Sequence, residues 1–423
     1  MADLQGKPSF AGPAARASHR RMRARGIRVL PAAKRWGGGP HAVWWRGRRL
    51  GVGGSSENLP ASAPSTPPPR YTGSPSPSRD GEELPRLLKL ILAATLLAFP
   101  ATAQARQVAL GYLPAFKGME QAAAGADFSY YTHVALAFVN PGPDGSFIAG
   151  DRLACAPNGD KTMLKVEAVK ALAARVHAAG GKLVLSLGGG TVPQCAGDWA
   201  ALTAPAKRAK LVAALTKLVD RVGADGVDVD IEWDVLSKID KAGDYTPFVA
   251  ALSAALKAKG RLLTCATASG EGGMIPQASI PYFDLVGVMS YDAIGQSWGE
   301  PGAEHATVDQ ARRDVKLWLD RGVPREKLLL GLPFYGYGFG AAKPNYSFRD
   351  IRSEYGDAAL LTDTIGSRCG GCTYITYNGL PTLKEKARLA RAQAGGIMVW
   401  EISQDTPDHL LIRSLQEEPD AAQ

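Results

Sequence analysis

The chain has 423 residues, of which 45% are hydrophobic and 21% charged, so it is long enough for one large globular domain or two ordinary ones. Its formal net charge is +9, but the basic residues are unevenly placed: residues 1–105 hold 16 Lys and Arg against 5 Asp and Glu, whereas residues 106–423 hold 33 against 35. The second part is close to neutral and lacks the basic surface of a nucleic-acid-binding domain, so we expect no nucleic-acid partner.

Residues 1–83 do not have the pattern of a folded domain. Arg clusters and three Trp residues occur there without helical or strand periodicity, and a Pro- and Ser-rich run follows over 60–78. Such a composition buries too little apolar surface to fold. We expect this leader to be disordered, or to be an over-extended gene model that is not translated. A basic arm that binds nucleic acid is the alternative.

Residues 84–105 have the three parts of a signal peptide. Arg86 and Lys89 give the positive start, residues 90–99 form an apolar stretch, and Ala-Gln-Ala at 103–105 is a small-x-small cleavage site. A membrane-spanning helix needs about 20 apolar residues, and this stretch is shorter. We therefore expect a secreted protein, extracellular or periplasmic, with no stable membrane anchor and a mature chain that starts near residue 106.

All five cysteines lie in the predicted mature chain, where export permits disulfides. Cys155 with Cys195 and Cys369 with Cys372 are plausible pairs, while Cys265 lies in an apolar run and would be a buried free thiol. A redox Cys-x-x-Cys at 369–372 is the alternative, but its spacer is two glycines and no helix start follows. A four-ligand zinc site would need a second Cys or His pair at ligand spacing, which the sequence lacks.

From residue 107 onward, short apolar runs alternate with longer amphipathic ones. The expected strands are 108–112, 133–139, 182–187, 226–232, 261–268, 284–290, 327–332 and 396–402, and the expected helices are 164–179, 199–222, 245–259, 308–321 and 383–394. Eight alternating strands over roughly 300 residues without a linker predict a closed parallel (β/α)8 barrel, a TIM barrel, as a single catalytic domain over 106–423. An open doubly wound sheet is the alternative, but neither glycine-rich segment matches a phosphate-binding loop.

The most informative segment is Asp-Gly-Val-Asp-Val-Asp-Ile-Glu at 225–232. Alternate side chains of a strand share a face, so Asp228, Asp230 and Glu232 point one way, about 6.5 Å apart in succession, and the intervening apolar residues point the other. The apolar set must pack against helices, so the acids point into the barrel. Like charges in a confined interior raise pKa values, which keeps a carboxylic acid protonated and able to donate. Glu232 is the expected general acid. Asp225 lies an odd number of residues from the three acids, so its side chain is on the other face of the strand and is expected to shape the start of the strand.

Two other interpretations of this segment remain open. A solvated acidic edge strand would also be rich in carboxylates, although the apolar alternation and Gly226 favour burial. Acidic strands also hold hard cations, as in a magnesium-dependent phosphohydrolase, but no basic cluster or phosphate loop accompanies this one. We expect neither a metal nor a cofactor.

The acidic segment resembles the catalytic signature of family 18 glycoside hydrolases, the chitinase-like enzymes, on the fourth barrel strand. Other segments are similar to further strand ends of that family, in the same order along the chain: Gly111-Tyr112, Ala137-Phe138, Ser186-Leu-Gly-Gly189, Met289-Ser-Tyr291-Asp292, Gly331-Leu-Pro-Phe-Tyr335-Gly336 and Trp400-Glu401. The resemblance covers essentially all of 107–417. It implies a secreted, bacterial-type enzyme that hydrolyses β-1,4 bonds in N-acetylglucosamine polymers such as chitin.

The resemblance also implies a retaining, substrate-assisted mechanism, which is an exception to the usual pair of protein carboxylates. The substrate's own 2-acetamido oxygen attacks the anomeric carbon, while Glu232 protonates the leaving oxygen. Asp230 accepts the acetamido N–H, Asp228 shares a proton with Asp230, and Tyr291 donates its hydroxyl to the acetamido oxygen. Trp400 forms the hydrophobic floor under the sugar.

The further substrate-binding residues predicted on the same strand ends are Met289, Asp292, Tyr335, Tyr112 and Trp233. Aromatic and Met side chains also fill barrel interiors, so Met289 and Tyr335 have a core role as the alternative, and so has Trp400. Trp233 and Trp298 follow strands and would equally serve as loop anchors. Ser186 is expected to be structural, with the glycines after it allowing a close backbone approach to the acids.

The sequence departs from the family pattern at two places. Tyr337 stands where many chitinases have an Arg, and the stretch 340–382 is short for the α+β insertion between strands seven and eight, which we expect to be small or absent. We therefore expect a shallow, endo-acting cleft in a monomer that binds an oligosaccharide or polysaccharide. Peptidoglycan and the chitobiose core of N-glycans are alternative substrates, and a non-catalytic chitin-binding lectin is the alternative class.

Overall fold

The computed structural model describes residues 107–417. The leader expected over 1–83 and the signal peptide expected over 84–105 lie outside the described residues. Within 107–417, none of the helices combines the length and the apolar character needed to span a bilayer.

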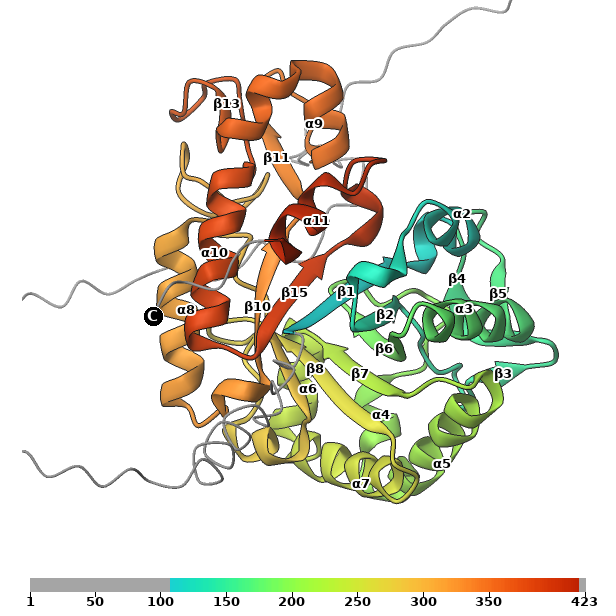
Figure 1. Cartoon of the computed structure of the whole chain (residues 1–423). Helices are drawn as coiled ribbons and strands as arrows, with labels where there is room; N and C mark the ends of the chain where they lie inside the picture. Colours follow the sequence, from blue (N-terminus) through green and yellow to red (C-terminus); the bar gives the residue numbers. More distant parts are fainter. Residues whose placement is uncertain (1–106, 418–423) are drawn as a thin grey trace, which may run out of the picture. The chain divides into compact units, whose positions relative to one another are not determined.

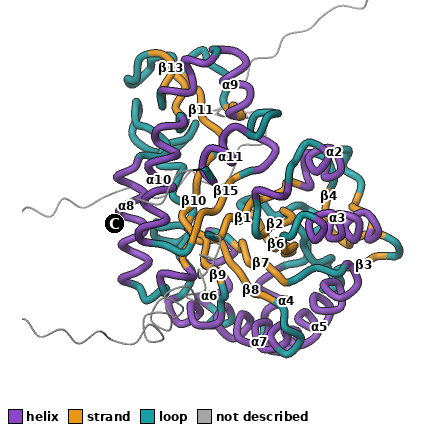
Figure 2. The backbone as a smooth tube through the Cα atoms, viewed as in Figure 1, coloured by secondary structure: helices purple, strands orange, loops and turns teal. Residues whose placement is uncertain are grey.

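Eight parallel strands close into a barrel (Figures 1 and 2), in the order β1-β2-β6-β7-β8-β9-β10-β15 and back to β1. Their bounds are β1 Val108–Pro114, β2 His133–Ala137, β6 Lys182–Gly189, β7 Gly226–Ile231, β8 Leu262–Thr267, β9 Leu285–Val288, β10 Leu328–Pro333 and β15 Gly396–Trp400. Each coincides with one of the eight strands expected from the sequence, so the (β/α)8 barrel is confirmed.

Helices cover the outside of the barrel (Figure 1). The five expected ones are present as α3 Val166–Ala178, α4 and α5 Trp199–Thr203 and Pro205–Val222, α7 Tyr245–Lys257, α8 Val308–Asp320 and α10 Leu380–Gln393. The single helix expected over 199–222 is two helices, because Pro205 starts α5 at its first turn and forces the preceding residue out of the helical region. The sequence did not predict the short helices α2 Met119–Ala124, α6 Trp233–Lys241, α9 Phe348–Tyr355 and α11 Leu410–Gln416.

The barrel has two separate apolar layers. Outward strand residues such as Val227, Val229 and Ile231 pack with the helices in one large core. Inward residues such as Tyr112, Val184, Ala266 and Met398 form a second cluster inside the barrel. This division confirms the parity predicted for β7: its apolar side chains face the helices, so its acidic side chains face the interior.

A small antiparallel sheet follows β2, and a disulfide fixes it. Its strands are β3 Ile148–Ala149, β4 Arg152–Pro157 and β5 Met163–Lys165. Cys155 of β4 is bonded to Cys195 in the loop after β6, and Cys369 is bonded to Cys372 further along the chain. Cys265 is a buried free thiol. The plausible pairings and the free thiol are therefore as expected.

An α+β insertion separates β10 from β15. Its four-stranded antiparallel sheet has the order β12-β11-β14-β13, with β11 Tyr335–Phe339, β12 Asn345–Ser347, β13 Thr364–Gly366 and β14 Tyr374–Thr376, and α9 follows β12. The insertion is small, as the length of the stretch indicated, but it is present. Strands of three to five residues carry too little alternation to be recognised in a sequence.

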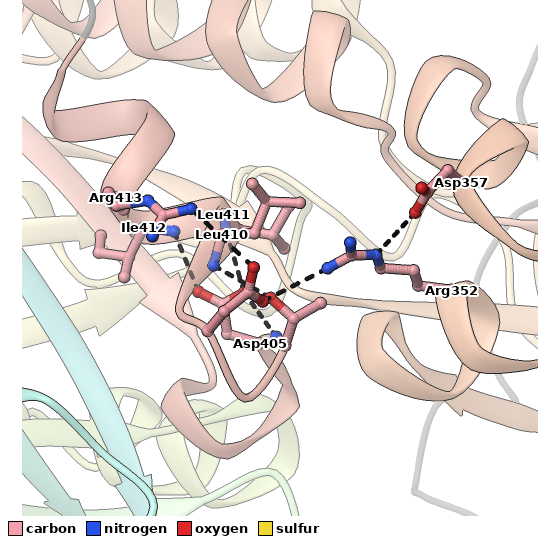
Figure 3. Close-up of polar contacts among 9 residues, drawn as sticks. Arg352, Asp357, Asp405, Leu410, Leu411, Ile412 and Arg413 are labelled. Carbon is pink, nitrogen blue, oxygen red and sulfur yellow. Dashed lines mark hydrogen bonds and ion pairs between the residues drawn. The ribbon is translucent and has the colours of Figure 1, made fainter.

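Charged groups tie the insertion to the segment after β15 (Figure 3). Arg352 of α9 donates to Asp357 over 3.1 Å and to Asp408 over 3.3 Å. Beside this pair, the buried Asp405 accepts hydrogen bonds from the backbone N–H groups of Thr406, Leu411 and Ile412 at 2.6 to 3.0 Å. The carboxylate of Asp405 therefore satisfies donors at the start of α11 that have no partner within the helix.

We expect Asp405→Ala to lower the free energy of unfolding by about 1–3 kcal/mol, because it leaves buried backbone donors without an acceptor. Urea unfolding followed by circular dichroism measures this. Asp408→Ala is the control, since Asp408 is half exposed and its loss should cost less than about 1 kcal/mol. Equal stabilities of the two variants would contradict the capping role of Asp405.

Candidate active site

Strand β7 places three carboxyl groups at its carboxyl end, inside the barrel. Asp228 lies opposite Ser186 of β6 and Thr264 of β8, and Asp230 lies opposite Gly188. Asp228 is fully buried, Asp230 is 2% exposed, and Glu232, just past the strand at the start of α6, is partly exposed. The exposure thus increases from the interior of the barrel to its rim.

Asp228 is held by three hydroxyl donors. Tyr112 and Ser186 each donate to Oδ2 over 2.8 Å, and Thr264 donates to Oδ1 over 2.6 Å. Burial raises the pKa of Asp228, and these three hydrogen bonds oppose the rise because they stabilise the carboxylate. Tyr112, which the sequence predicted to bind substrate, has a side chain that is 1% exposed and a hydroxyl that is engaged with Asp228.

Asp230 differs from its neighbour in having little hydrogen-bond support. Its Oδ1 is buried and accepts no hydrogen bond from any residue in 107–417. Its pKa is raised well above the ordinary range, first by burial and then by the charges of Glu232 and Asp228. A buried carboxyl oxygen without a protein donor is costly unless something else supplies the donor.

Burial also raises the pKa of Glu232, to about 8, with the charge of Asp292 as the second cause and a contact of Trp233 opposing it. The carboxyl group lies over the backbone at the end of β6: a Cβ at Gly190 would be 3.1 Å from Glu232 Oε1. A Cβ at Gly188 would lie 2.4 Å from the carbonyl oxygen of Asp230. These glycines therefore allow the close approach that the sequence predicted beside Ser186.

Tyr291 and Asp292 follow β9 on the other side of the acids. Tyr291 is buried, and the charges of Asp292, Asp230 and Glu232 add to burial in raising its pKa. Its ring packs edge-on against Tyr335, with centroids 6.0 Å apart. Tyr335 in turn donates its hydroxyl to Asp292. The structure thus brings Tyr291, Asp292 and Tyr335 together beside the carboxylates.

His305 is a neighbour of this site that sequence reasoning missed. Its ring is fully buried, packs against Tyr335 and Tyr337 with centroids 5.2 and 5.5 Å away, and places Nδ1 3.8 Å from Asp292 Oδ1. Burial lowers its pKa. A single His in a loop with no motif around it gives no signal in the sequence.

Trp400 ends β15 and is the centre of an aromatic group at the rim. Its ring lies 5.4 Å from that of Tyr112 and 5.8 Å from that of Phe138, the latter at 22°. Phe138 is stacked in turn on Phe116 at 6.4 Å and 10°. Phe116 is 44% exposed, which is unusual for a large apolar side chain, and the sequence analysis did not single it out. The half-buried Trp400 therefore continues outward into an exposed aromatic surface.

A cavity of about 480 Å³ lies between the barrel rim and the insertion. Asp292, Tyr335 and Trp400 line it, and the remaining lining residues are Lys117, Tyr337, Asn345, Tyr346, Ser347, Arg349, Asp350, Ser403 and Gln404. Strand β12 and helix α9 contribute residues to the wall of this cavity, so the small insertion adds to its depth.

The other predicted residues have different surroundings. Met289 packs on the interior cluster together with Trp400. Trp233 covers the loop after β8, where a Cβ at Gly273 would lie 2.8 Å from its ring. Trp298 donates its indole N–H to the carbonyl oxygen of Asp292 over 2.9 Å. Trp298 is thus a loop anchor, and Trp233 packs against the loop after β8.

A carboxylic acid that stays protonated near neutral pH is a proton donor, and the carboxyl end of a barrel strand is where such a group acts in enzymes of this fold. Residues 107–417 contain no group of three or more His, Cys, Asp or Glu side chains arranged to hold a metal ion. The chain belongs to family 18 of the glycosyl hydrolases, whose family model matches residues 108–405.

Two relatives illustrate the similarity in sequence. A probable chitinase 10 of Drosophila melanogaster is 25% identical over 276 residues, 53% of this chain and 12% of the relative. A chitinase-like effector of Moniliophthora roreri is 28% identical over 289 residues, 62% of this chain and 65% of the relative. The chain therefore matches less than two thirds of the length of either protein.

Solved structures agree with the fold. The GH18 chitinase ChiB of Flavobacterium johnsoniae has a TM-score of 0.60 and 28% identity, covering 74% of this chain and 93% of its own. A GH18 chitinase of Cycas revoluta, solved in complex with (GlcNAc)3, has a TM-score of 0.59 and 21% identity, covering 73% of this chain and 99% of its own.

Proposed function

We propose that this protein hydrolyses β-1,4-glycosidic bonds in N-acetylglucosamine polymers, chitin or chitooligosaccharides, by retaining, substrate-assisted catalysis. The observation that carries the proposal is the inward face of β7: Asp228, Asp230 and Glu232 lie in a line, with Asp228 saturated by donors and a buried oxygen of Asp230 without one. An acetamido N–H of the substrate supplies the missing donor.

Glu232 acts as general acid and then as general base. In the first step the acetamido oxygen bonds to the anomeric carbon, the bond from that carbon to the glycosidic oxygen breaks, and Glu232 gives its proton to the departing oxygen. In the second step the Glu232 carboxylate takes a proton from water, whose oxygen attacks the same carbon and opens the oxazolinium ring. The raised pKa of Glu232 keeps it protonated for the first step.

Asp230 and Tyr291 orient the attacking group. Asp230 accepts the acetamido N–H and stabilises the positive charge that develops on the ring. Asp228 shares a proton with Asp230, and its three hydroxyl donors allow it to take up the charge when the proton moves. Tyr291 is close enough to Asp230 and Glu232 for their charges to raise its pKa. From this position its hydroxyl donates a hydrogen bond to the acetamido oxygen.

Trp400 forms the floor for the sugar, since apolar C–H faces of a pyranose stack on aromatic rings. Phe138 and Phe116 extend this surface for further sugars along the chain. Asp292 and Tyr335 bind on the cavity side, while Met289 packs beneath the site and Trp233 borders its opposite edge. The exposed ring of Phe116 supports endo-acting cleavage of a long chain, because it offers a sugar contact outside the cavity.

The other expectations are kept as proposals. Residues 84–105 and the two disulfides support secretion to the periplasm or exterior, and we propose a monomer. Peptidoglycan and the chitobiose core of N-glycans remain alternative substrates. A non-catalytic sugar-binding protein is the alternative class, to which the name of the Moniliophthora roreri relative draws attention, but such a protein has no use for a protonated Glu232.

Hydrolysis of chitotetraose by the mature chain, with and without EDTA, tests the proposal. We expect cleavage that survives the chelator, with the β-anomer as the first product in a proton NMR time course. Binding without cleavage would identify a lectin, loss of activity in EDTA would favour a metal-dependent enzyme, and an α-anomer would exclude retention.

The pH dependence follows from the raised pKa of Glu232. The protonated form is the active general acid, so the proton donor is present below the folded pKa of Glu232 and is lost as the pH rises through about 8. We expect kcat/KM for chitotetraose to be nearly constant across neutral pH. Above the pKa of Glu232 it should fall about tenfold for each further pH unit. A basic limb near pH 5, the range of an ordinary Glu, would contradict this.

A further inference from the structure

The residue that follows the proposed sugar floor is a buried carboxylate. Glu401 has no exposed surface, although it directly follows the half-exposed Trp400. Its Oε2 accepts the backbone N–H of Ser403 over 2.7 Å, and its Oε1 accepts the Ser403 hydroxyl over 2.9 Å. These two bonds fix the turn after β15, but they do not neutralise the charge.

Lys117 supplies the opposite charge from another part of the barrel. It ends the 3₁₀ helix η1 Ala115–Lys117, directly after β1, and its Nζ lies 2.7 Å from Glu401 Oε1. No second cation from residues 107–417 lies within ion-pair distance of Glu401. The charge of Glu401 also adds to burial and the charge of Asp405 in raising the pKa of the buried Tyr131. Lys117 itself is 43% exposed and lines the cavity with Trp400.

The ion pair runs beside the aromatic contacts described above. Phe116 precedes Lys117 and Trp400 precedes Glu401, and Phe138 stacks between Phe116 and Trp400. Two consecutive residues after β1 are therefore joined to the last residue of β15 and the residue after it, Phe116 to Trp400 through the ring of Phe138 and Lys117 to Glu401 through their charges. Strands β1 and β15 are direct neighbours in the barrel.

We propose that Lys117 and Glu401 form a positioning pair that holds Trp400 in place as the sugar floor. The inference rests on the proposed function only in that Trp400 contacts the sugar. Neither residue touches the reacting atoms. Lys117 holds Glu401, and Glu401 fixes the backbone immediately after Trp400.

The physical reason is the cost of an isolated buried charge. Removing one partner of a buried ion pair leaves the other desolvated and uncompensated, which is far more harmful than removing both. Without Lys117, the ionised Glu401 must move towards water, and Trp400 must move with it. When Glu401 is also made neutral, that force disappears.

The test compares Lys117→Met, Glu401→Gln, the double variant and Lys117→Arg in the mature chain. We expect Lys117→Met to raise KM for chitotetraose about tenfold at pH 7 with a smaller effect on kcat, and the double variant and Lys117→Arg to recover most of that loss.

A matched surface pair serves as control. Lys316 and Asp320 are also 2.7 Å apart but both are exposed, so Lys316→Met and Asp320→Asn should leave KM unchanged. A double variant as impaired as Lys117→Met would overturn the proposal, since Lys117 would then act on the substrate directly. An unchanged KM in Lys117→Met would overturn it as well.

Failure of the proposed function has a different outcome. Wild-type protein that neither binds nor cleaves chitotetraose contradicts the function, and the same four variants then measure the pair through thermal unfolding. A positive interaction between the two substitutions there supports the pair, and additive effects on Tm overturn it.

Discussion

Glu232→Gln is expected to lower kcat for chitotetraose about 1,000-fold or more, because it removes the proton donor and leaves the geometry of the site intact. Gln has the size of Glu, so the close contact with the backbone of Gly190 is kept. Initial rates measured from released sugars give kcat, and calorimetric titration gives the affinity of the inactive variant for the same substrate, which should stay within about threefold of the wild-type value.

The matched control for this variant is Glu167→Gln, a change of the same kind at an exposed position on α3. We expect wild-type kinetics there. If Glu232→Gln kept more than about a tenth of the wild-type kcat, another group would be the general acid and the proposed assignment of Glu232 would be wrong.

Asp230→Ala is expected to lower kcat about 100-fold to 1,000-fold, because the attacking acetamido group loses the acceptor that orients it and the charge that stabilises the transition state. Asp230→Asn should be impaired to a similar degree, since an amide retains the size of the side chain but cannot carry the charge. The effect should fall mainly on kcat and less on KM. Steady-state kinetics with chitotetraose separates the two.

Asp225 offers a matched control on the same segment. Its side chain faces away from the site, where Oδ2 contacts His177 Nε2 over 2.7 Å and accepts the backbone N–H of Leu183 over 2.8 Å. We expect Asp225→Asn to leave kcat unchanged and to affect stability alone. A comparable loss of kcat in the variants of Asp225 and Asp230 would mean that the acidic strand matters only for folding.

Much of the fold could be predicted from the sequence because its signals are local. The alternation of Val and Asp over β7 sets which side chains face inward, and the apolar runs mark the eight strands within a few residues. The pKa values of Asp230 and Glu232 are raised, as the sequence predicted, but burial is the larger cause in both, and the charge that adds to it at Glu232 is that of Asp292. Because successive side chains of a strand point to opposite faces, a single segment of sequence is enough to predict which residues face the barrel interior.

The remaining features depend on contacts that no local pattern records. Tyr112 looked like a sugar contact, but the register of β1 in the closed barrel turns its hydroxyl to Asp228. His305 lies in a loop and Phe116 in the short helix η1, and tertiary packing sets the course of both segments. The strands of the insertion are too short to show a period. In each case the deciding partner is distant in sequence.

Tyr337 is an instructive departure from the family pattern, in which many members have an Arg. Its ring packs against Tyr335 and His305, with centroids 5.7 and 5.5 Å away. The basic side chain 3.8 Å from Asp292 Oδ1 is thus a buried His, and burial lowers its pKa and so favours its neutral form. An Arg at this position would place a permanent positive charge near Asp292, whereas Tyr337 places none there.

Inhibition by chitobiose thiazoline, a stable mimic of the cyclic oxazolinium intermediate, tests most directly whether the substrate's own amide is the nucleophile. The arrangement of Asp230, Tyr291 and Glu232 predicts competitive inhibition with a Ki at least about 100-fold below the KM for chitotetraose, and a much weaker effect on Asp230→Ala. Full activity of the wild-type enzyme at thiazoline concentrations well above that KM would contradict substrate assistance.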